Sequence, residues 1–131
     1  MAPVKVWIID DDNLFVFLTR KTIKATNVEA IVSEFSDGLS AMDQLKSIVA
    51  DPEQLPDIIL IDLSMPVMDG WEFLDEYSSY IAPLTDKKVR LYIFSSSISP
   101  HDIERAKYIK SVTDFVIKPL LKDKFIEMIS S

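Results

Sequence analysis

Apolar residues fall into five short runs that alternate with more polar segments along the chain. The runs are VKVWIID (4–10), VEAIVSEF (28–35), DIILID (57–62), VRLYIF (89–94) and DFVIK (114–118). Each run is too short for a typical helix, and together they favour Val, Ile, Phe and Tyr, which are common in strands. DIILID contains four aliphatic residues in succession, a pattern typical of a strand that is buried on both faces. The pattern therefore predicts five buried strands.

Between and after these runs, apolar residues recur at helical spacing. The fourth such segment, SPHDIERAKYI (99–109), has the clearest start, because Ser99 is a natural N-cap, Pro100 suits the first helical position and Asp102 completes a capping box. The other predicted helices are a segment after Asn13, which we expect to be its N-cap, and segments from Leu39 to Val49, from Trp71 to Tyr77 and over LLKDKFIEMI (120–129).

Strand and helix thus alternate throughout as (βα)₅, which predicts an α/β fold with parallel strands joined by right-handed crossovers. The segments ADPEQLP (50–56) and APLTDKK (82–88) are interpreted as connecting loops rather than domain boundaries. We therefore expect residues 1–131 to form one domain.

Composition and charge exclude several classes of function. Without cysteine, the chain has neither disulfides nor cysteine-ligated metals. Its net charge of −7 opposes direct binding of nucleic acid. The start of the sequence lacks a secretory pattern, and no apolar run has the length of a membrane span, so we expect a cytoplasmic protein without membrane insertion.

Polar residues are concentrated where the predicted strands end. Asp10 and Asp11 finish the first run, Asp62 finishes the third, Ser95 follows the fourth and Lys118 finishes the fifth. Ligands of open parallel sheets bind outside the carboxyl ends of the strands. If the first and third strands are neighbours, three or more carboxylates meet there, close to an ammonium and a hydroxyl group.

Such a cluster has the chemistry of a phosphoryl-transfer site. Close carboxylates repel one another, and a hard divalent cation such as Mg²⁺ (or Mn²⁺) relieves the repulsion while also binding phosphate oxygens. Lys118 and Ser95 add a positive charge and a hydroxyl donor for the phosphoryl group. Asp62 stands singly at the end of a central strand and is the best candidate for a nucleophile that attacks phosphorus.

Four motifs carry a resemblance to response regulator receiver domains of two-component signalling. They are IIDDDN (8–13), IILIDLSMPVMDG (58–70), IFSS (93–96) and VIKP (116–119), in the order and at the spacing of the family. The resemblance covers nearly the whole chain. It implies a single receiver domain over residues 1–131 with a flavodoxin-like (βα)₅ fold, a three-layer sandwich whose five-stranded parallel sheet has the order 2-1-3-4-5.

The resemblance also implies a role for each site residue. Asp62 becomes the phosphoacceptor, and Asp10 and Asp11 the acidic pair that holds Mg²⁺, together with the backbone carbonyl of Ser64. The other implied roles are Ser95 as the switch hydroxyl, Ser96 as the small residue beside it, Lys118 as the phosphoryl-binding lysine before a cis peptide bond to Pro119, and Phe115 as the rotating aromatic residue.

By the same resemblance, a sensor histidine kinase or a histidine phosphotransfer protein supplies the phosphoryl group. Ser95 and Phe115 then rearrange the surface of the fourth helix, fifth strand and fifth helix, roughly residues 96–131, for an output protein. The protein would catalyse its own phosphorylation and dephosphorylation rather than act as an enzyme on other substrates. The small side chains of Ser64 and Ser97 leave water a path to the phosphoryl group, which predicts a short-lived modification.

Three alternatives are weighed against this interpretation. A haloacid-dehalogenase-type phosphatase also uses an aspartate nucleophile with Mg²⁺, but that family has Thr or Val where this chain has Leu14, and the chain leaves little room for a cap domain. A histidine phosphotransfer module would be entirely helical, with a histidine in mid-helix. A degenerate receiver would act only by binding, and the full set of site residues argues against it.

Several other residues are interpreted as structural. Asp12 is expected to be a solvated acid at the helix start, Asp69-Gly70 a turn before the third helix, and His101 a solvated residue. Both tryptophans, Trp7 and Trp71, are expected to pack in the core. The family often places a helix-capping residue shortly after Lys-Pro, where this chain has Leu120-Leu121. We therefore expect either a frayed start of the last helix or leucines that face a partner.

Overall fold

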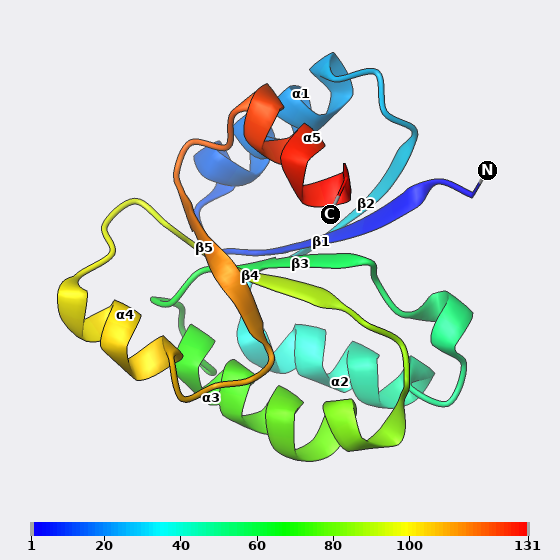
Figure 1. The fold of residues 1–131 in the computed structure, drawn as a ribbon, viewed down its shortest axis with the longest axis vertical. Helices are drawn as coiled ribbons and strands as arrows, with labels where there is room; N and C mark the ends of the chain where they lie inside the picture. Colours follow the sequence, from blue (N-terminus) through cyan, green and yellow to red (C-terminus); the bar gives the residue numbers. More distant parts are fainter. Residues whose placement is uncertain (1, 131) are drawn as a thin grey trace.

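A computed structural model describes residues 2–130, so residues 1 and 131, the ends of the expected domain, lie outside the described part. The chain forms a parallel sheet of order β2-β1-β3-β4-β5 (Figure 1). This confirms the predicted fold. The strands are β1 (Val4–Ile9), β2 (Ala30–Phe35), β3 (Ile58–Ile61), β4 (Arg90–Ser95) and β5 (Val112–Ile117). The α-helices are α1 (Asn13–Ala25), α2 (Gly38–Ile48), α3 (Gly70–Glu76), α4 (Pro100–Ala106) and α5 (Lys122–Ser130), and three shorter helical segments lie between elements: η1 (Pro52–Gln54), η2 (Tyr77–Ile81) and η3 (Ala82–Leu84).

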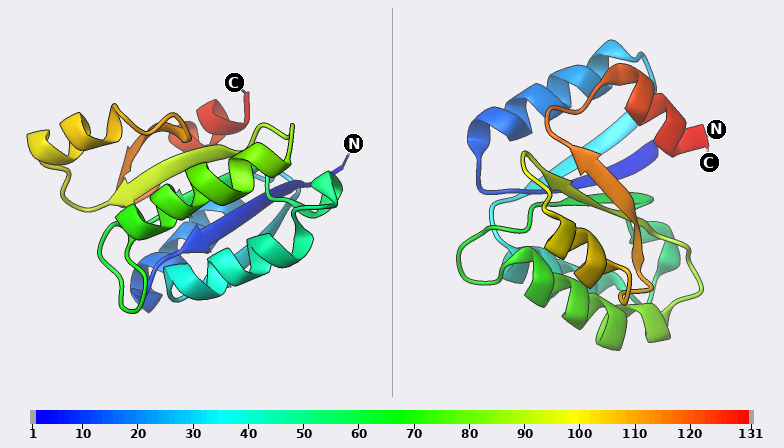
Figure 2. Two further views of the ribbon diagram at one scale, coloured as in Figure 1. Left: turned by 90° about the horizontal axis from the view of Figure 1, so that it is seen from below. Right: turned by 60° about the vertical axis from the view of Figure 1, so that its left-hand side comes forward.

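Helices cover both faces of the sheet. Figures 1 and 2 show α1 and α5 on one face and α2, α3 and α4 on the other. Alternate residues of each central strand point into two separate cores; Ile8 and Leu60 pack beneath α1 and α5, and Ile9 and Ile61 pack against α2 and α3. All four residues of β3 are buried, as the aliphatic run predicts. Within residues 2–130, no helix combines the length and the apolar character needed to cross a bilayer.

Polar caps fix where the helices begin. Asp12, rather than the predicted Asn13, is the N-cap of α1, because its carboxylate accepts the backbone N–H groups of Leu14 and Phe15. The prediction was wrong by one residue, since both residue types are good N-caps and only the backbone path distinguishes them. The predicted capping box of α4, formed by Ser99 and Asp102, is confirmed.

Leu120 and Leu121, for which the sequence predicted either a frayed start of the last helix or contact with a partner, have different surroundings in the structure. After the cis Lys118–Pro119 peptide bond, Leu120 lies in the core with 2% of its surface exposed, so it is not available to a partner. Leu121 is 65% exposed. The helix begins at Lys122, two residues later than predicted, and the buried Leu120 lies in the segment before it.

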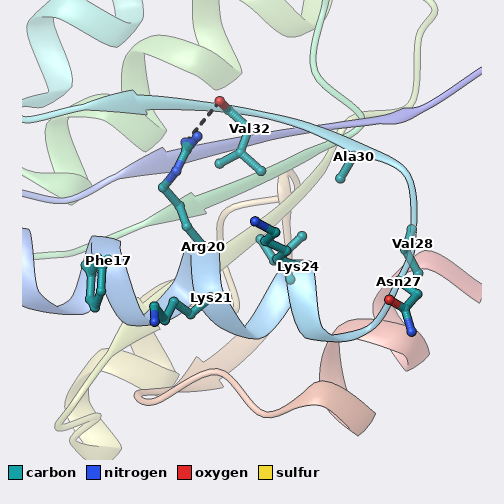
Figure 3. A pocket seen from close by; sticks show the side chains of 9 residues that line it. Phe17, Arg20, Lys21, Lys24, Asn27, Val28, Ala30 and Val32 are labelled. Atoms are coloured by element: carbon teal, nitrogen blue, oxygen red, sulfur yellow. Dashed lines mark hydrogen bonds between the residues drawn. The ribbon is translucent and has the colours of Figure 1, made fainter.

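The edge of β2 is partly covered by a side chain from α1. Since β2 is the first strand of the sheet, its outer edge has no strand partner, and Arg20 donates a hydrogen bond to the carbonyl oxygen of Val32 (3.2 Å) (Figure 3). Arg20 also pairs with Glu34 at 2.9 Å. A groove of about 520 Å³ remains between α1 and β2, beside Lys24 and Ala30. Charged cover of this kind discourages pairing with the edge of another sheet.

A carboxylate at the opposite end of the sheet joins three segments. Asp57, directly before β3, accepts the backbone N–H of Lys5 in β1 (2.8 Å) and pairs with the ammonium of Lys87, which precedes β4 (3.0 Å). Burial raises the pKa of Asp57, but the hydrogen bonds from Lys5 and Lys87 outweigh that effect, and the pKa is lowered overall. The ionised carboxylate therefore stabilises the folded chain.

We expect Asp57→Asn to lower the free energy of unfolding by about 1 kcal/mol at pH 7, as for a partly exposed, charge-assisted hydrogen bond. Because the pKa of Asp57 is lowered in the folded state, its contribution is present above the unfolded pKa of about 4 and is lost as the pH falls through the folded value. Urea denaturation from pH 7 to pH 3 measures this. The matched control is Asp86→Asn, at the exposed neighbour of Lys87. If the difference in the free energy of unfolding between Asp57→Asn and wild type did not change with pH, the lowered pKa of Asp57 would be contradicted.

Candidate functional site

The carboxyl end of the sheet holds a buried ion pair. Asp10 follows β1, is 2% exposed, and its Oδ1 accepts the N–H of Asp12 (3.0 Å). Its Oδ2 lies 2.6 Å from Nζ of Lys118. This contact has the distance of an ion pair but not the angles of a hydrogen bond, so Oδ2 has no hydrogen-bond partner within residues 2–130. The Lys118 ammonium, held by charge rather than by a directed hydrogen bond, is therefore the partner of this buried oxygen.

Lys118 is held rigidly beside this carboxylate. Its backbone N–H donates to the carbonyl oxygen of Ser95 (2.9 Å), which continues the pairing of β4 with β5. Its ammonium lies 4.7 Å from the ring centroid of Phe15 and 5.5 Å from that of Phe94. It also lies 3.6 Å from Oδ2 of Asp62. Only 4% of the side chain is exposed, so one positive charge is fixed between two carboxylates.

Asp62 completes the cluster from the end of β3. Its N–H donates to the carbonyl oxygen of Ile9 (3.0 Å), which fixes it beside the end of β1. Its side chain is 13% exposed, and Oδ1 accepts a long hydrogen bond from the N–H of Ser64 (3.5 Å). One oxygen from each of Asp10, Asp11 and Asp62 can be chosen so that all three lie within 4.8 Å of one another. The sequence-predicted acids are thus brought together.

The three carboxyl groups make it harder for one another to ionise. Burial raises the pKa of Asp62, the Lys118 ammonium opposes this, and the carboxylates of Asp10 and Asp11 add to the increase. The pKa is raised overall, so one lysine does not neutralise the cluster. Three oxygen ligands at this separation and an uncompensated negative charge fit a hard divalent cation such as Mg²⁺.

A pocket of about 390 Å³ opens beside Asp62. Ser95, at the end of β4, lines it, and its hydroxyl donates to the carbonyl oxygen of Ser97 (3.0 Å) and accepts the N–H of the same residue (3.3 Å). Ser95 therefore bonds within its own loop rather than to the carboxylates. Ser96 is exposed. The pocket is lined by Asp62, Leu63, Ser64, Met65, Asp69, Trp71, Ser95, Ser97 and Asp102.

Phe115 lies on β5 outside this pocket. It is half-buried and packs against the core on the face of α2 and α3. In the β4–β5 register it pairs with Ile93, whereas Ser95 pairs with Ile117. Ser95 and Phe115 thus lie on neighbouring strands, two residues apart in register. Their roles as a switch stay a prediction.

The loop after Asp62 is fixed by the only two glycines of the chain. A Cβ on Gly70 would lie 2.4 Å from the carbonyl oxygen of Asp62, and a Cβ on Gly38 would lie 2.6 Å from that of Met68. Val67 in this loop has φ 67° and is 73% exposed, a strained conformation for a β-branched residue. Asp69 is more than a turn residue, since it forms the capping box of α3 with Glu72. The sequence analysis gave Gly70 only as part of a turn and did not consider Gly38, so it missed these close approaches.

The other structural interpretations are mostly confirmed. Trp7 is buried and packs on Phe35, with ring centroids 4.5 Å apart, and His101 is exposed. Sequence reasoning missed the contact of Trp71 with Arg105, whose guanidinium carbon lies 4.3 Å from the ring centroid. No local pattern pairs residues of two different helices in this way.

The sequence model of the response regulator receiver domain matches residues 6–130. The chain belongs to this family. Receiver domains are the phosphoacceptors of two-component signalling, and this chain shares that general function. The chemotaxis protein CheY of Bacillus subtilis is 28% identical over 123 residues, which cover 94% of this chain and 92% of that protein.

Solved structures agree with this assignment. A two component response regulator from Cytophaga hutchinsonii is 28% identical to this chain, with a TM-score of 0.87. The match covers 99% of this chain and 96% of that one. The Mn²⁺-bound form of response regulator Rcp1 shares the fold, with a TM-score of 0.74 at 24% identity over 98% of this chain and 91% of that one. The five-stranded sheet rules out the all-helical phosphotransfer module. The family match favours a receiver over a haloacid-dehalogenase-type phosphatase.

We expect Asp62→Asn to raise the free energy of unfolding by about 0.5–1 kcal/mol at pH 7 without divalent cations, a gain typical of relieving an unfavourable surface or site charge. The raised pKa means that ionised Asp62 costs stability at neutral pH, and this cost disappears as the pH falls through that pKa. The difference in the free energy of unfolding between Asp62→Asn and wild type should therefore become smaller as the pH is lowered. Denaturant unfolding with a chelator measures it, with Asp12→Asn as control. An Asp62→Asn variant no more stable than wild type would contradict the charge conflict.

Proposed function

We propose that Asp62 of this receiver domain accepts a phosphoryl group from a phosphohistidine, with Mg²⁺ or Mn²⁺ bound beside it. The observation that carries the proposal is the position of Lys118, whose ammonium lies 2.6 Å from Asp10 and 3.6 Å from Asp62. This fixed positive charge borders Asp62, which follows β3 in the middle of the sheet and is the one of the three carboxylates that lines the pocket. The proposal covers residues 1–131 as one receiver domain.

The acidic cluster suits the cation. Asp10, Asp11 and Asp62 would hold it, and the backbone carbonyl of Ser64 would add a fourth oxygen. The raised pKa of Asp62 supports this, because added positive charge would favour its ionised form. When bound, the cation neutralises charge on the phosphoryl oxygens and orients them. The receiver family binds Mg²⁺ or Mn²⁺ through such a cluster, and one similar response regulator, Rcp1, was solved in a Mn²⁺-bound form.

The residues of this chain would then act as follows. A carboxylate oxygen of Asp62 attacks phosphorus, the bond from phosphorus to the donor imidazole nitrogen breaks, and the imidazole leaves. Lys118 stabilises the negative charge on the transferred oxygens from its fixed position. The hydroxyl of Ser95 gives up its bonds within the loop and turns to the phosphoryl group, and Phe115 moves into the space that it leaves. The surface of α4, β5 and α5 changes as a result.

Hydrolysis of the phosphoryl group on Asp62 would take place in the same pocket. Water attacks phosphorus in line, the bond to the Asp62 carboxylate oxygen breaks, and inorganic phosphate leaves. Ser64 and Ser97 both line the pocket with small side chains, which supports a short-lived modification. The protein thus catalyses its own phosphorylation and dephosphorylation and acts on no other substrate.

Partners follow from this chemistry. Receivers interact with histidine kinases, and we propose a sensor histidine kinase or a histidine phosphotransfer protein as the donor. An output protein would recognise the α4-β5-α5 surface, where Ile117, Leu121 and Ile126 are exposed. The net charge of −7 opposes direct binding of nucleic acid. We place the protein in the cytoplasm, without membrane insertion.

Incubation with Mg²⁺ and acetyl phosphate, followed by intact-mass measurement, tests the proposal. We expect wild type to gain one phosphoryl group and Asp62→Asn to gain none, because within residues 2–130 Asp62 is the one carboxylate that both pairs with Lys118 and lines the pocket. Asp12→Asn is the matched control, since Asn also caps a helix and should leave phosphorylation unchanged. Chelation of Mg²⁺ should abolish uptake by wild type.

Two results would contradict the proposal. One is equal uptake by wild type and Asp62→Asn, which would place the acceptor elsewhere. The other is no uptake by wild type, which would favour a degenerate receiver that acts only by binding.

A further inference from the structure

The pocket beside Asp62 has two walls that come from different parts of the chain. One wall is the loop after β3 and the first turn of α3, including Ser64 and Trp71. The other is the loop after β4 and the first turn of α4, including Ser97 and Asp102. The width of the pocket therefore depends on how firmly α4 is held against α3.

Among residues 2–130, one cation–π contact joins these walls. The guanidinium carbon of Arg105, on α4, lies 4.3 Å from the centroid of the Trp71 ring, on α3. Trp71 itself lines the pocket. Within residues 2–130, no carboxylate forms an ion pair with Arg105, so the ring of Trp71 is the partner of this charge. We call this contact the Trp71–Arg105 stack.

Helix α4 has few other attachments of its own, although Ile109 after it packs against the core and Ser111 hydrogen-bonds to Ser78 (3.0 Å). It has seven residues, of which Ala106 alone is buried, and Ile103 on it is 42% exposed. Its capping box of Ser99 and Asp102 is local and does not reach another helix. An element with so little buried apolar surface opens easily unless specific contacts hold it. The end of α4 is thus held by the core, and the Trp71–Arg105 stack is the contact that ties α4 to the Trp71 wall of the pocket.

We propose that the Trp71–Arg105 stack keeps the pocket narrow and thereby sets the lifetime of the phosphoryl group on Asp62. This rests on the proposed phosphorylation of Asp62. Loss of the bond between phosphorus and the carboxylate oxygen requires a water molecule to reach phosphorus in line, transfer its oxygen to phosphate and give up a proton to solvent. A closed stack restricts that approach, and a loosened α4 widens it. Arg105 is thus a positioning residue that acts through Trp71 and touches no reacting atom.

The test begins with the lifetime of the phosphorylated protein. The protein is phosphorylated with acetyl phosphate and Mg²⁺, the donor is removed, and loss of the phosphoryl group is followed by intact mass. We expect Arg105→Ala to shorten the half-life by about two- to fivefold, the rate change that corresponds to losing one exposed cation–π contact. Arg105→Lys retains a cation and should lie between Arg105→Ala and wild type.

The matched control is Lys107→Ala. It removes one positive charge just after α4, from a side chain that pairs with Glu104 at 3.1 Å and not with Trp71. We expect its half-life to equal that of wild type. Arg105 and Lys107 are both exposed, so both variants should fold.

A second readout does not depend on phosphorylation. Trp7 is 6% exposed, so acrylamide quenches mainly the fluorescence of Trp71. Arg105→Ala should increase the quenching constant, and Lys107→Ala should not.

The outcomes are distinguishable. Phosphorylated Arg105→Ala with the half-life of wild type, or equal shortening by Lys107→Ala, would overturn this inference and leave the proposed function standing. Wild type that takes up no phosphoryl group would overturn the proposed function and this inference with it. Quenching that is unchanged in Arg105→Ala would show that the stack does not cover Trp71 in solution, which also overturns the inference.

Discussion

The buried ion pair between Lys118 and Asp10 is the interaction on which the rest of the site depends. Its partners follow β5 and β1, which two other strands separate in the sheet, so the lysine reaches across the end of β3 to meet the aspartate. Removing one member of such a pair leaves an unpaired charge in the interior, a change that typically costs about 3–5 kcal/mol. The pair therefore fixes both ends of the acidic edge, with Asp62 between them.

The ion pair does not remove the charge conflict at this edge. One ammonium faces Asp10 and Asp62, and Asp11 lies close enough to share a ligand with both. The pKa of Asp62 stays raised. Functional sites often retain such destabilising features, because they are relieved only when the ligand binds. The fold thus holds in place the groups that favour a cation and a phosphoryl group.

Much of this arrangement could be predicted from the sequence, for a physical reason. Parallel strands buried on both faces give unmistakable apolar runs, and the residue that follows each run must lie at the same edge of the sheet. The apolar runs were therefore enough to place Asp10, Asp62 and Lys118 at one edge of the sheet. That the first and third strands are neighbours, which brings the two acids together, was implied by the resemblance to receiver domains. The choice between Asp12 and Asn13 as a cap could not be made in this way, because it depends on the local backbone path. Burial of Leu120 and the stacking of Arg105 on Trp71 depend on contacts between distant segments, which no local pattern encodes.

The central claim is that the acidic edge exists to bind a divalent cation, and a Mg²⁺ titration of thermal stability tests it most directly. For a cation that binds only the folded state, each tenfold increase in concentration above its dissociation constant adds about 1.4 kcal/mol of stability. We predict that the stability of wild type rises with Mg²⁺ concentration in this way and that the stability of Asp11→Asn rises much less. NaCl at equal ionic strength should not produce the increase in either protein. A melting temperature of wild type that does not respond to Mg²⁺ beyond the effect of NaCl would contradict the account.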